Sequence, residues 1–251
     1  MRIKTGYLSL IVACLLAVST SACGGSSEPE IVVNDDNGRS YNPLIEAANF
    51  VRTIDNPFLS LTPGKTWVYE GTGENGLSLR SEFEVTRDTK TILGVTTTVV
   101  RDRSWLNGNL SEDTLDWYAQ DREGNVWYFG EDSKEIKNGK VASTEGSWEA
   151  GVKGAKAGII MKGQPHVGDT YRQEYLKGEA EDVAELLGIN ESVTIRLGSY
   201  SKCVLIKEWV PNEKAIVEEK HYCQEAGNLV KSKKVAGESG QAELVEVKAA
   251  R

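Results

Sequence analysis

Histidine, methionine and cysteine are scarce in this sequence, with 2, 2 and 4 residues among 251. A zinc site takes three or four His, Cys or acidic ligands at close spacing, and neither His166 nor His221 lies in such a cluster. There is also no Cys-x-x-Cys motif, no Gly-x-Ser-x-Gly nucleophile motif and no Gly-Lys-Ser/Thr phosphate loop. We therefore predict no metal site and no cofactor, and the sequence identifies no catalytic residue.

Basic residues are outnumbered: 29 Lys and Arg stand against 37 Asp and Glu, which gives a net charge of −8. Nucleic-acid binding relies on a basic surface that neutralises phosphates. The acidic balance therefore argues against a nucleic-acid partner. No basic block indicates electrostatic docking on anionic lipid either.

The N-terminus has the three parts of an export signal. Arg2 and Lys4 precede an apolar run, and the small residues Ser19 to Ala22 follow it. We read residues 1–22 as a signal peptide, since the run is shorter than the roughly 20 apolar residues that span a bilayer. Cys23 comes next, and the arrangement resembles the lipobox of bacterial lipoproteins, which implies a lipidated Cys23 carrying acyl chains such as palmitate.

Two outcomes at Cys23 stay open. Thr20 stands where a lipobox prefers leucine, so ordinary cleavage after Ala22 would leave a secreted, unlipidated protein. With lipidation, the chain is tethered in the bacterial cell envelope. Gly24 follows the cysteine, and the resemblance then implies the outer membrane, facing the periplasm, in a Gram-negative host.

Residues 23–40 are rich in Gly, Ser, Asp and Asn and are predicted to form a flexible tether. Residues 41–251 are predicted to form a single β domain, because Val, Thr, Tyr and Trp are spread along them between turn residues. Helical spacing between two glycines predicts one helix over 178–188, and a shorter helix is expected within 43–50.

A repeat recurs at a constant offset of 104 residues. The matching positions are Gly64-Lys65-Thr66-Trp67 with Gly168-Asp169-Thr170-Tyr171, Leu93-Gly94 with Leu197-Gly198, Trp105 with Trp209, and Tyr118 with Tyr222. We infer two copies, at about 56–130 and 160–234, joined by a glycine-rich connector over 131–165.

Each copy reads as a meander of short strands punctuated by Gly, Asn and Asp. Strands are predicted at 66–71, 79–86, 96–105, 113–121 and 126–130, then at 170–175, 192–196, 201–210, 215–223 and 229–233, with one more at 242–247. The expected fold is all-β with one or two short helices, an internally duplicated antiparallel meander that forms a barrel-like or strongly curved sheet.

Cys203 and Cys223 are predicted to form a disulfide, since disulfides persist in exported proteins. A hairpin centred on Glu213 places the two cysteines opposite each other, with Lys207 opposite Glu219 and Trp209 opposite Val217. Directly opposed side chains are close enough for the bond. Two buried thiols are the alternative.

Transferring this register to the first hairpin places Asp102 opposite Asp116, with Val100 and Tyr118 as the next pair on that face. Close carboxyl groups can share a proton or hold a cation, although a solvated rim or a shifted register would explain the pair equally well. Tyr118, Trp127 and Trp148 belong to a dense group of aromatic residues, one face of which could line a ligand cleft instead of the core. These residues and Glu174 are the candidate ligand-binding residues.

Three phrases carry a family resemblance: residues 56–71, from Asn56 to Gly71, residues 116–121, which read Asp-Trp-Tyr-Ala-Gln-Asp, and residues 146–151, which read Gly-Ser-Trp-Glu-Ala-Gly. They resemble a group of uncharacterised bacterial exported proteins, many known only as lipoproteins, over most of residues 41–247. The resemblance implies an envelope protein and supplies no activity. More loosely, the pattern is similar to periplasmic carriers that wrap apolar lipid or lipoprotein in a curved sheet.

The leading hypothesis is a non-enzymatic envelope lipoprotein that binds an apolar or saccharide ligand, or a protein partner. A hydrolase that uses Asp102, Asp116 or Glu174 as acid and base is the first alternative. A structural or assembly protein that uses a sheet edge or face is the second.

Overall fold

The computed structural model describes residues 41–211, 217–237 and 239–250. The predicted signal peptide, the predicted tether and Cys23 all lie outside these residues. Within them the chain forms two short 3-10 turns, η1 (Ala47–Asn49) and η2 (Glu74–Gly76), and nineteen strands.

The first part of the chain contributes β1 (Phe50–Val51), β2 (Asp55–Asn56), β3 (Leu59–Ser60), β4 (Thr66–Thr72), β5 (Ser78–Ile92), β6 (Val95–Leu106), β7 (Asn109–Asp121) and β8 (Val126–Asp132). The middle contributes β9 (Glu135–Lys137), β10 (Lys140–Ser143), β11 (Trp148–Glu149) and β12 (Lys156–Met161). The last part contributes β13 (Thr170–Arg172), β14 (Glu174–Tyr175), β15 (Val183–Ile195), β16 (Gly198–Trp209), β17 (Val217–Cys223), β18 (Asn228–Ala236) and β19 (Gln241–Lys248).

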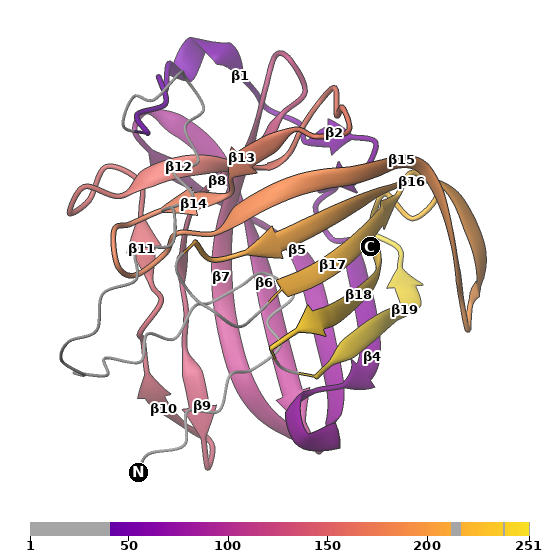
Figure 1. Ribbon diagram of the computed structural model, residues 1–251. Coiled ribbons are helices and arrows are strands. Elements are labelled where there is room, and N and C mark those ends of the chain that lie inside the picture. The colour runs from indigo at the N-terminus through magenta and orange to yellow at the C-terminus, as the bar shows by residue number, and fades with distance from the viewer. Residues whose placement is uncertain (1–40, 212–216, 238, 251) are drawn as a thin grey trace, which may run out of the picture.

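Seventeen of these strands form one antiparallel sheet that curves into a nearly closed barrel (Figure 1), and β2 and β3 pair separately. From β4 the neighbours run β5, β6, β7, β8 and β12 in one direction. In the other direction they run β19, β18, β17, β16, β15 and β13. The predicted all-β, barrel-shaped antiparallel sheet is confirmed.

The barrel closes where β12 pairs with β14, which follows β13 in the chain after Gln173. The backbones approach closely here: a Cβ on Gly158 of β12 would lie 2.3 Å from the carbonyl carbon of Gln173. Only glycine allows this approach, since no real Cβ contact is that short.

The two parts of the chain have the same strand order, β4 to β8 and β13 to β18, and an added strand joins each to the other: β12 lies between β8 and β14, and β19 lies between β18 and β4. This arrangement is what two copies of one unit would give, although the duplication itself stays a prediction. The segment predicted as a connector carries β9 to β12.

The helix predicted over 178–188 is wrong. After a turn at Gly178, residues from Val183 onward form β15, where Ala184 pairs with Tyr171 on one side and with Glu208 on the other. Hydrogen bonding to two neighbouring strands overrides a local helical preference. The shorter helix is likewise reduced to the 3-10 turn η1.

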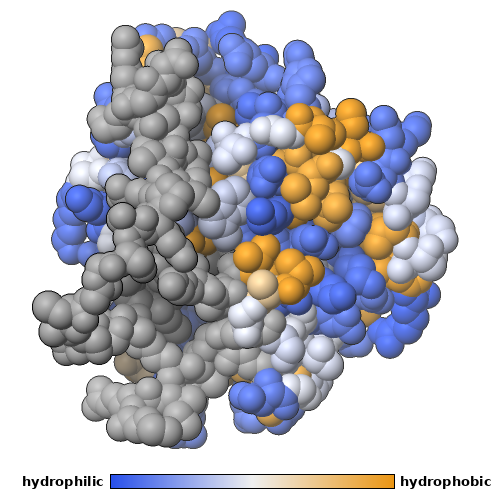
Figure 2. Space-filling model, in the orientation of Figure 1, coloured by the Kyte–Doolittle hydropathy of each residue, from blue (hydrophilic) through white to orange (hydrophobic). Residues whose placement is uncertain are grey.

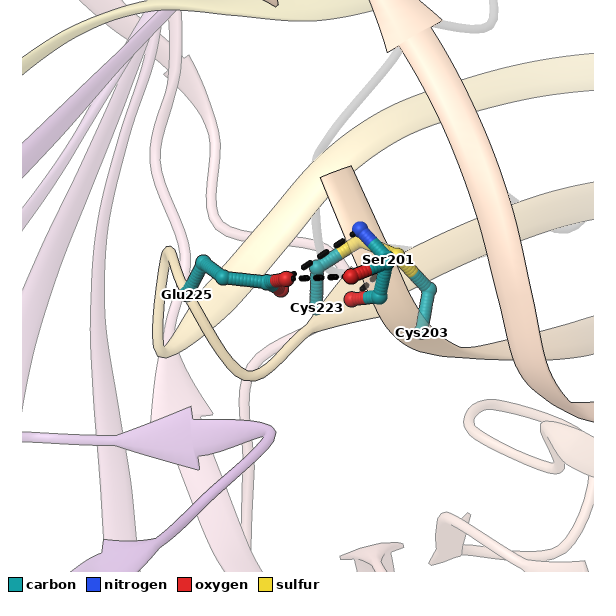
Figure 3. The surroundings of a disulfide bond; sticks show 4 residues. All are labelled: Ser201, Cys203, Cys223 and Glu225. Atoms are coloured by element: carbon teal, nitrogen blue, oxygen red, sulfur yellow. Dashed lines mark hydrogen bonds between the residues drawn. A yellow bond between two sulfur atoms is a disulfide. The ribbon is translucent and has the colours of Figure 1, made fainter. Parts of the chain in front are cut away.

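The disulfide between Cys203 and Cys223 is present, on neighbouring strands β16 and β17 (Figure 3). The predicted register is confirmed throughout this hairpin, with Lys207 opposite Glu219 and Trp209 opposite Val217. Glu225 accepts hydrogen bonds from the backbone N–H and the hydroxyl of Ser201 beside the bridge (Figure 3).

The register predicted for the first hairpin is wrong by two residues. Asp102 lies opposite Thr114, and Asp116 lies opposite Val100. The cause is the turn: Asn107 and Gly108 form a two-residue connection with positive φ at both positions, and a bulge follows beside Trp105. Asp102 and Asp116 therefore lie diagonally on the same face of the sheet.

The outer surface is mostly hydrophilic on the face shown in Figure 2, with separate apolar patches. Across the described residues, no helix combines the length and the apolar character that crossing a membrane requires.

Candidate functional site

Acidic side chains line the inside of the barrel. Strand alternation turns every second residue inward, and eight carboxyl groups are buried there: Asp102, Glu112, Asp116, Glu131, Glu174, Asp182, Glu208 and Glu218. Only Lys220 and Lys234 are buried among the basic residues that the structure describes. An unpaired buried charge is costly. Each of these carboxyl groups therefore needs a bound proton, a hydrogen-bond donor or a nearby cation.

The hydroxyl of Tyr128 lies between two of these carboxyl groups. It is 2.7 Å from Oδ1 of Asp116 and 3.0 Å from Oε2 of Glu131. One hydroxyl proton can serve only one acceptor, so the second contact needs a proton on a carboxyl group. Burial raises the pKa of Asp116 to about 7, and burial and the Asp116 charge raise the pKa of Glu131 well above its usual value.

An aromatic stack connects this carboxyl pair to the other half of the barrel. Tyr118 stacks on Tyr128 with ring centroids 5.0 Å apart, and Trp148 meets Tyr128 edge-on at 5.3 Å. The indole N–H of Trp148 donates to Oε2 of Glu174 at 2.9 Å. The aromatic residues therefore hold acidic groups from β7, β8 and β14 at fixed positions.

Glu174 faces Asp182 at the end of this stack. Burial raises the pKa of Glu174 to about 7, and burial and the Glu174 charge raise that of Asp182. The hydrogen bond between the two groups raises the pKa of Asp182 and lowers that of Glu174.

The second half of the barrel contains its own cation. The ammonium of Lys220 lies 2.5 Å from Oε2 of Glu208 and 3.5 Å from Oε2 of Glu218, and all three side chains are almost fully buried. Gln173 donates to the other oxygen of Glu208 at 3.0 Å. Within this ion triad, Oε1 of Glu218 has no hydrogen-bond partner.

In the first half, several buried acceptors have no hydrogen-bond partner. They are both carboxyl oxygens of Asp102, Oδ2 of Asp116, Oε1 of Glu131 and the hydroxyl of Tyr118. Burial and the charges of Asp116 and Glu112 raise the pKa of Asp102 well above its usual value. An ionised carboxylate can only accept a hydrogen bond, whereas the Tyr118 hydroxyl and a protonated carboxyl group can also donate one.

A groove of about 350 Å³ opens from the surface toward this region. Glu131 and Trp148 contribute to its lining, together with Trp117, Val152 and Leu176. In its wall the ammonium of Lys90 lies 3.4 Å from the Trp117 ring centroid and 2.6 Å from Oε2 of Glu149. The wall thus shows an ammonium held by an aromatic face and a carboxylate.

The structure brings five of the six candidate ligand-binding residues together. Asp102, Asp116, Tyr118, Trp148 and Glu174 all lie in or beside the carboxyl network. Trp127 does not: its neighbour Tyr128 points inward, and the indole of Trp127 donates to Asp121 and packs on Phe50 at the outer face. Whether any of them binds a ligand stays a prediction.

Sequence reasoning missed Glu112, Glu131, Asp182 and the ion triad around Lys220. Glu131 is the first residue of the predicted connector, and its pairing with Asp116 lies beyond a register shift between β7 and β8. The signal that was available is alternation: Glu112, Thr114 and Asp116 occupy the inward positions of β7, where apolar residues are expected.

Among the described residues, no group of three or more His, Cys, Asp or Glu side chains is positioned to hold a metal ion.

No family model matches this chain, and no curated protein matches it in sequence. Two solved structures are similar in fold. One is described as an inferred exported protein with a YmcC-like fold, from Bacteroides fragilis, with 13% identity, a TM-score of 0.44, and coverage of 76% of this chain and 99% of that one. The other is an inferred lipoprotein from Parabacteroides distasonis, with 13% identity, a TM-score of 0.43, and coverage of 76% and 98%.

Proposed function

We propose that this protein is a lipid-anchored protein of the cell envelope, attached through Cys23, whose barrel binds a small ligand without transforming it. One observation carries the binding role: a groove of about 350 Å³ leads to Glu131 and Trp148, behind which lie buried polar groups without partners. Ligand sites are concave, with a few polar groups placed to fix orientation. The export signal in the sequence supports the location.

The binding role is tested by filling the groove. Val152 lies in its lining and is 49% exposed, so Val152→Trp can place an indole in the groove without disturbing the core. Val167→Trp is the matched control, because Val167 is also exposed and lies outside the groove lining. The measurement is native mass spectrometry of mature protein released gently from membranes.

We expect a non-covalent small-molecule adduct on the wild type and on Val167→Trp, and its loss on Val152→Trp. A wild-type protein that carries no adduct and takes up nothing from a total envelope extract would refute the binding role. The anchor has its own test: Cys23→Ser should abolish the mass of the acyl groups and release the protein from membranes.

The arrangement of Asp116, Tyr128 and Glu131 favours hydrolysis as the second candidate. A carboxyl group with a pKa near 7 can act as a general acid at neutral pH. Both carboxyl groups are buried, however, so a substrate would reach them only after neighbouring side chains move. Turnover of chromogenic glycosides or esters that is lost in Glu131→Gln would establish this candidate, and equal rates in the variant would remove it.

A further inference from the structure

A second groove, of about 600 Å³, lies on the outer face of the barrel and shares no lining residue with the groove at Trp148. Strand pairing places four of its lining residues in one row. Glu243 of β19 lies opposite Glu70 of β4, and Glu70 lies opposite Arg80 of β5. Arg80 in turn lies opposite Trp105 of β6, which is partly exposed. The register of the sheet therefore builds a row of charged and aromatic side chains across four strands.

The turn of the β15–β16 hairpin completes this outer groove. β16 pairs with β17 only from Cys203 onward, so the hairpin continues past β17 (Figure 1). Val193 and Ile195 near its tip are buried, so the tip packs on the molecule instead of projecting into solvent. Arg196, in the turn, joins the groove lining and donates to Oε2 of Glu70 at 3.1 Å. Side chains from distant parts of the sequence thus meet at one groove.

We propose that the outer groove binds a neutral saccharide. A sugar ring packs on the indole of Trp105, and its hydroxyl groups form hydrogen bonds with Arg80, Arg196 and Glu70. The size of the groove lies within the range of about 300–1,000 Å³ that ligand pockets occupy. The inference goes beyond the proposed function, because it adds a separate site with its own class of ligand.

The charges of the outer groove disfavour an ionic ligand. Its charged lining residues are two arginines and two glutamates, so their formal charges cancel. Oxygens of Glu70 lie 3.1 Å from Arg196 and 3.6 Å from Arg80, so an anion would have to displace a carboxylate that is already there. Glu243 is paired with Lys231 at 2.8 Å. Neither carboxylate of the lining therefore offers an uncompensated charge to a cation.

Hydroxyl groups fit these side chains without displacing them. A hydroxyl can donate to a carboxylate oxygen while it accepts from a guanidinium N–H, and a guanidinium has several donors to share between two partners. A purely apolar ligand would bury the same charges without replacing their hydrogen bonds to water. Trp105 adds a surface for the C–H groups of a sugar ring, because the face of an aromatic ring carries partial negative charge. The groove therefore matches a ligand with many hydroxyl groups and one apolar face.

The experiment measures binding of trisaccharides to the full mature chain by isothermal titration calorimetry at pH 7. The neutral probes are cellotriose, maltotriose, mannotriose and tri-N-acetylchitotriose, and trigalacturonic acid is the anionic comparison. We expect at least one neutral probe to bind. Trigalacturonic acid should bind at least about tenfold more weakly than that probe, because its carboxylates are repelled by Glu70 and Glu243.

Replacing the aromatic residue locates the sugar ring. Trp105→Ala should weaken binding of the tightest neutral probe at least about tenfold, as is typical of a tryptophan at the centre of a binding site. Trp209→Ala is the matched control. In both places a cation two residues earlier lies on the indole, Arg103 at 5.5 Å and Lys207 at 4.7 Å, but Trp209 is outside the groove lining.

Replacing the arginine of the hairpin turn tests the hydrogen bonds. The Arg196 side chain is 72% exposed, so Arg196→Gln should leave the thermal midpoint unchanged. It should weaken binding of the same probe about tenfold, since hydrogen bonds to charged groups are the stronger ones. Lys202→Gln is the control, because Lys202 is an exposed cation of the same hairpin outside the groove lining.

The outcomes separate this inference from the proposed function. Val152→Trp, which fills the groove at Trp148, should leave saccharide binding unchanged. Failure of all four neutral probes to bind, equal or tighter binding of trigalacturonic acid, or unchanged binding in Trp105→Ala would overturn the saccharide site and leave the small-molecule adduct of the other groove untouched. Should Trp105→Ala fail to fold, Arg196→Gln with its control still decides the question.

Discussion

Lys220 offers the sharpest test of how the barrel interior is held together. Its ammonium is 98% shielded from solvent and is the cation of a triad with Glu208 and Glu218. Replacing it with methionine keeps the aliphatic part of the side chain, removes the ammonium, and leaves two buried carboxyl groups without their counter-ion. Breaking a buried ion pair from one side costs about 3–5 kcal/mol.

The same charge removal at the surface gives the control. Lys231 pairs with Glu243 at 2.8 Å, but both side chains are more than a quarter exposed, and exposed pairs contribute about 0–1 kcal/mol. For a domain of this size, about 1 kcal/mol shifts the melting temperature by about 2–4 °C. We therefore expect Lys220→Met to lower it by roughly 6–20 °C and Lys231→Met by roughly 4 °C or less.

The measurement is thermal and urea unfolding followed by circular dichroism at pH 7 and at pH 5. The Lys220→Met penalty should shrink at pH 5, because without the ammonium the pKa of Glu218, which burial already raises, rises further and the group takes up a proton. Equal losses in the two variants, or a Lys220→Met penalty that grows at pH 5, would refute the assignment of this triad as the electrostatic centre of the second half.

Three further predictions concern stability. Reducing the Cys203–Cys223 bridge, or replacing both residues with serine, should cost about 3 kcal/mol in urea unfolding, given a sequence separation of 20; an unchanged midpoint after complete reduction would contradict it. Asp116 and Glu174 have folded-state pKa values of about 7, so the folded state holds protons that the unfolded state loses near pH 4. The free energy of unfolding should therefore fall with rising pH, by about 1.4 kcal/mol per pH unit for each group between pH 5 and 7. This slope should be smaller in Asp116→Asn, and a free energy of unfolding that rises over this range would contradict the prediction. Gly158→Ala should separate β12 from β14 and increase proteolysis at this junction, because the added Cβ meets the backbone of Gln173; a variant as resistant as the wild type would show that the barrel does not close there.

Local sequence pattern was enough for most of the long strands and for the register of one hairpin. The alternation in 201–210 and 217–223, anchored by two cysteines of known chemistry, predicts both the pairing and its register, and β16 and β17 follow it. The register of this hairpin could not be transferred to the first copy, because the two-residue turn at Asn107 and Gly108 sets its own register there. Offsets between repeats carry strand identity, whereas register is set locally by each turn.

The carboxyl network lay beyond sequence reasoning for a different reason. Asp116 and Glu131 are 15 positions apart and lie on opposite sides of a turn and a bulge, and Trp148 reaches Glu174 across the closure of the barrel. The helical spacing in 178–188 led to a predicted helix where β15 begins. Without β15, the sequence did not indicate that Asp182 lies inside the barrel. Tertiary pairing decided these positions, and a single sequence does not reveal it.

The buried charge in the interior argues for a function there. A barrel selected for stability alone would fill inward positions with apolar side chains, as Val100, Ile206 and Leu244 do. Both halves depart from that rule: Lys220 pairs with Glu208 and Glu218, while Oε1 of Glu218, the oxygens of Asp102 and the Tyr118 hydroxyl have no hydrogen-bond partner. Natural proteins break packing rules chiefly where a site needs it, so the polar interior behind the groove at Trp148 is where binding experiments should begin.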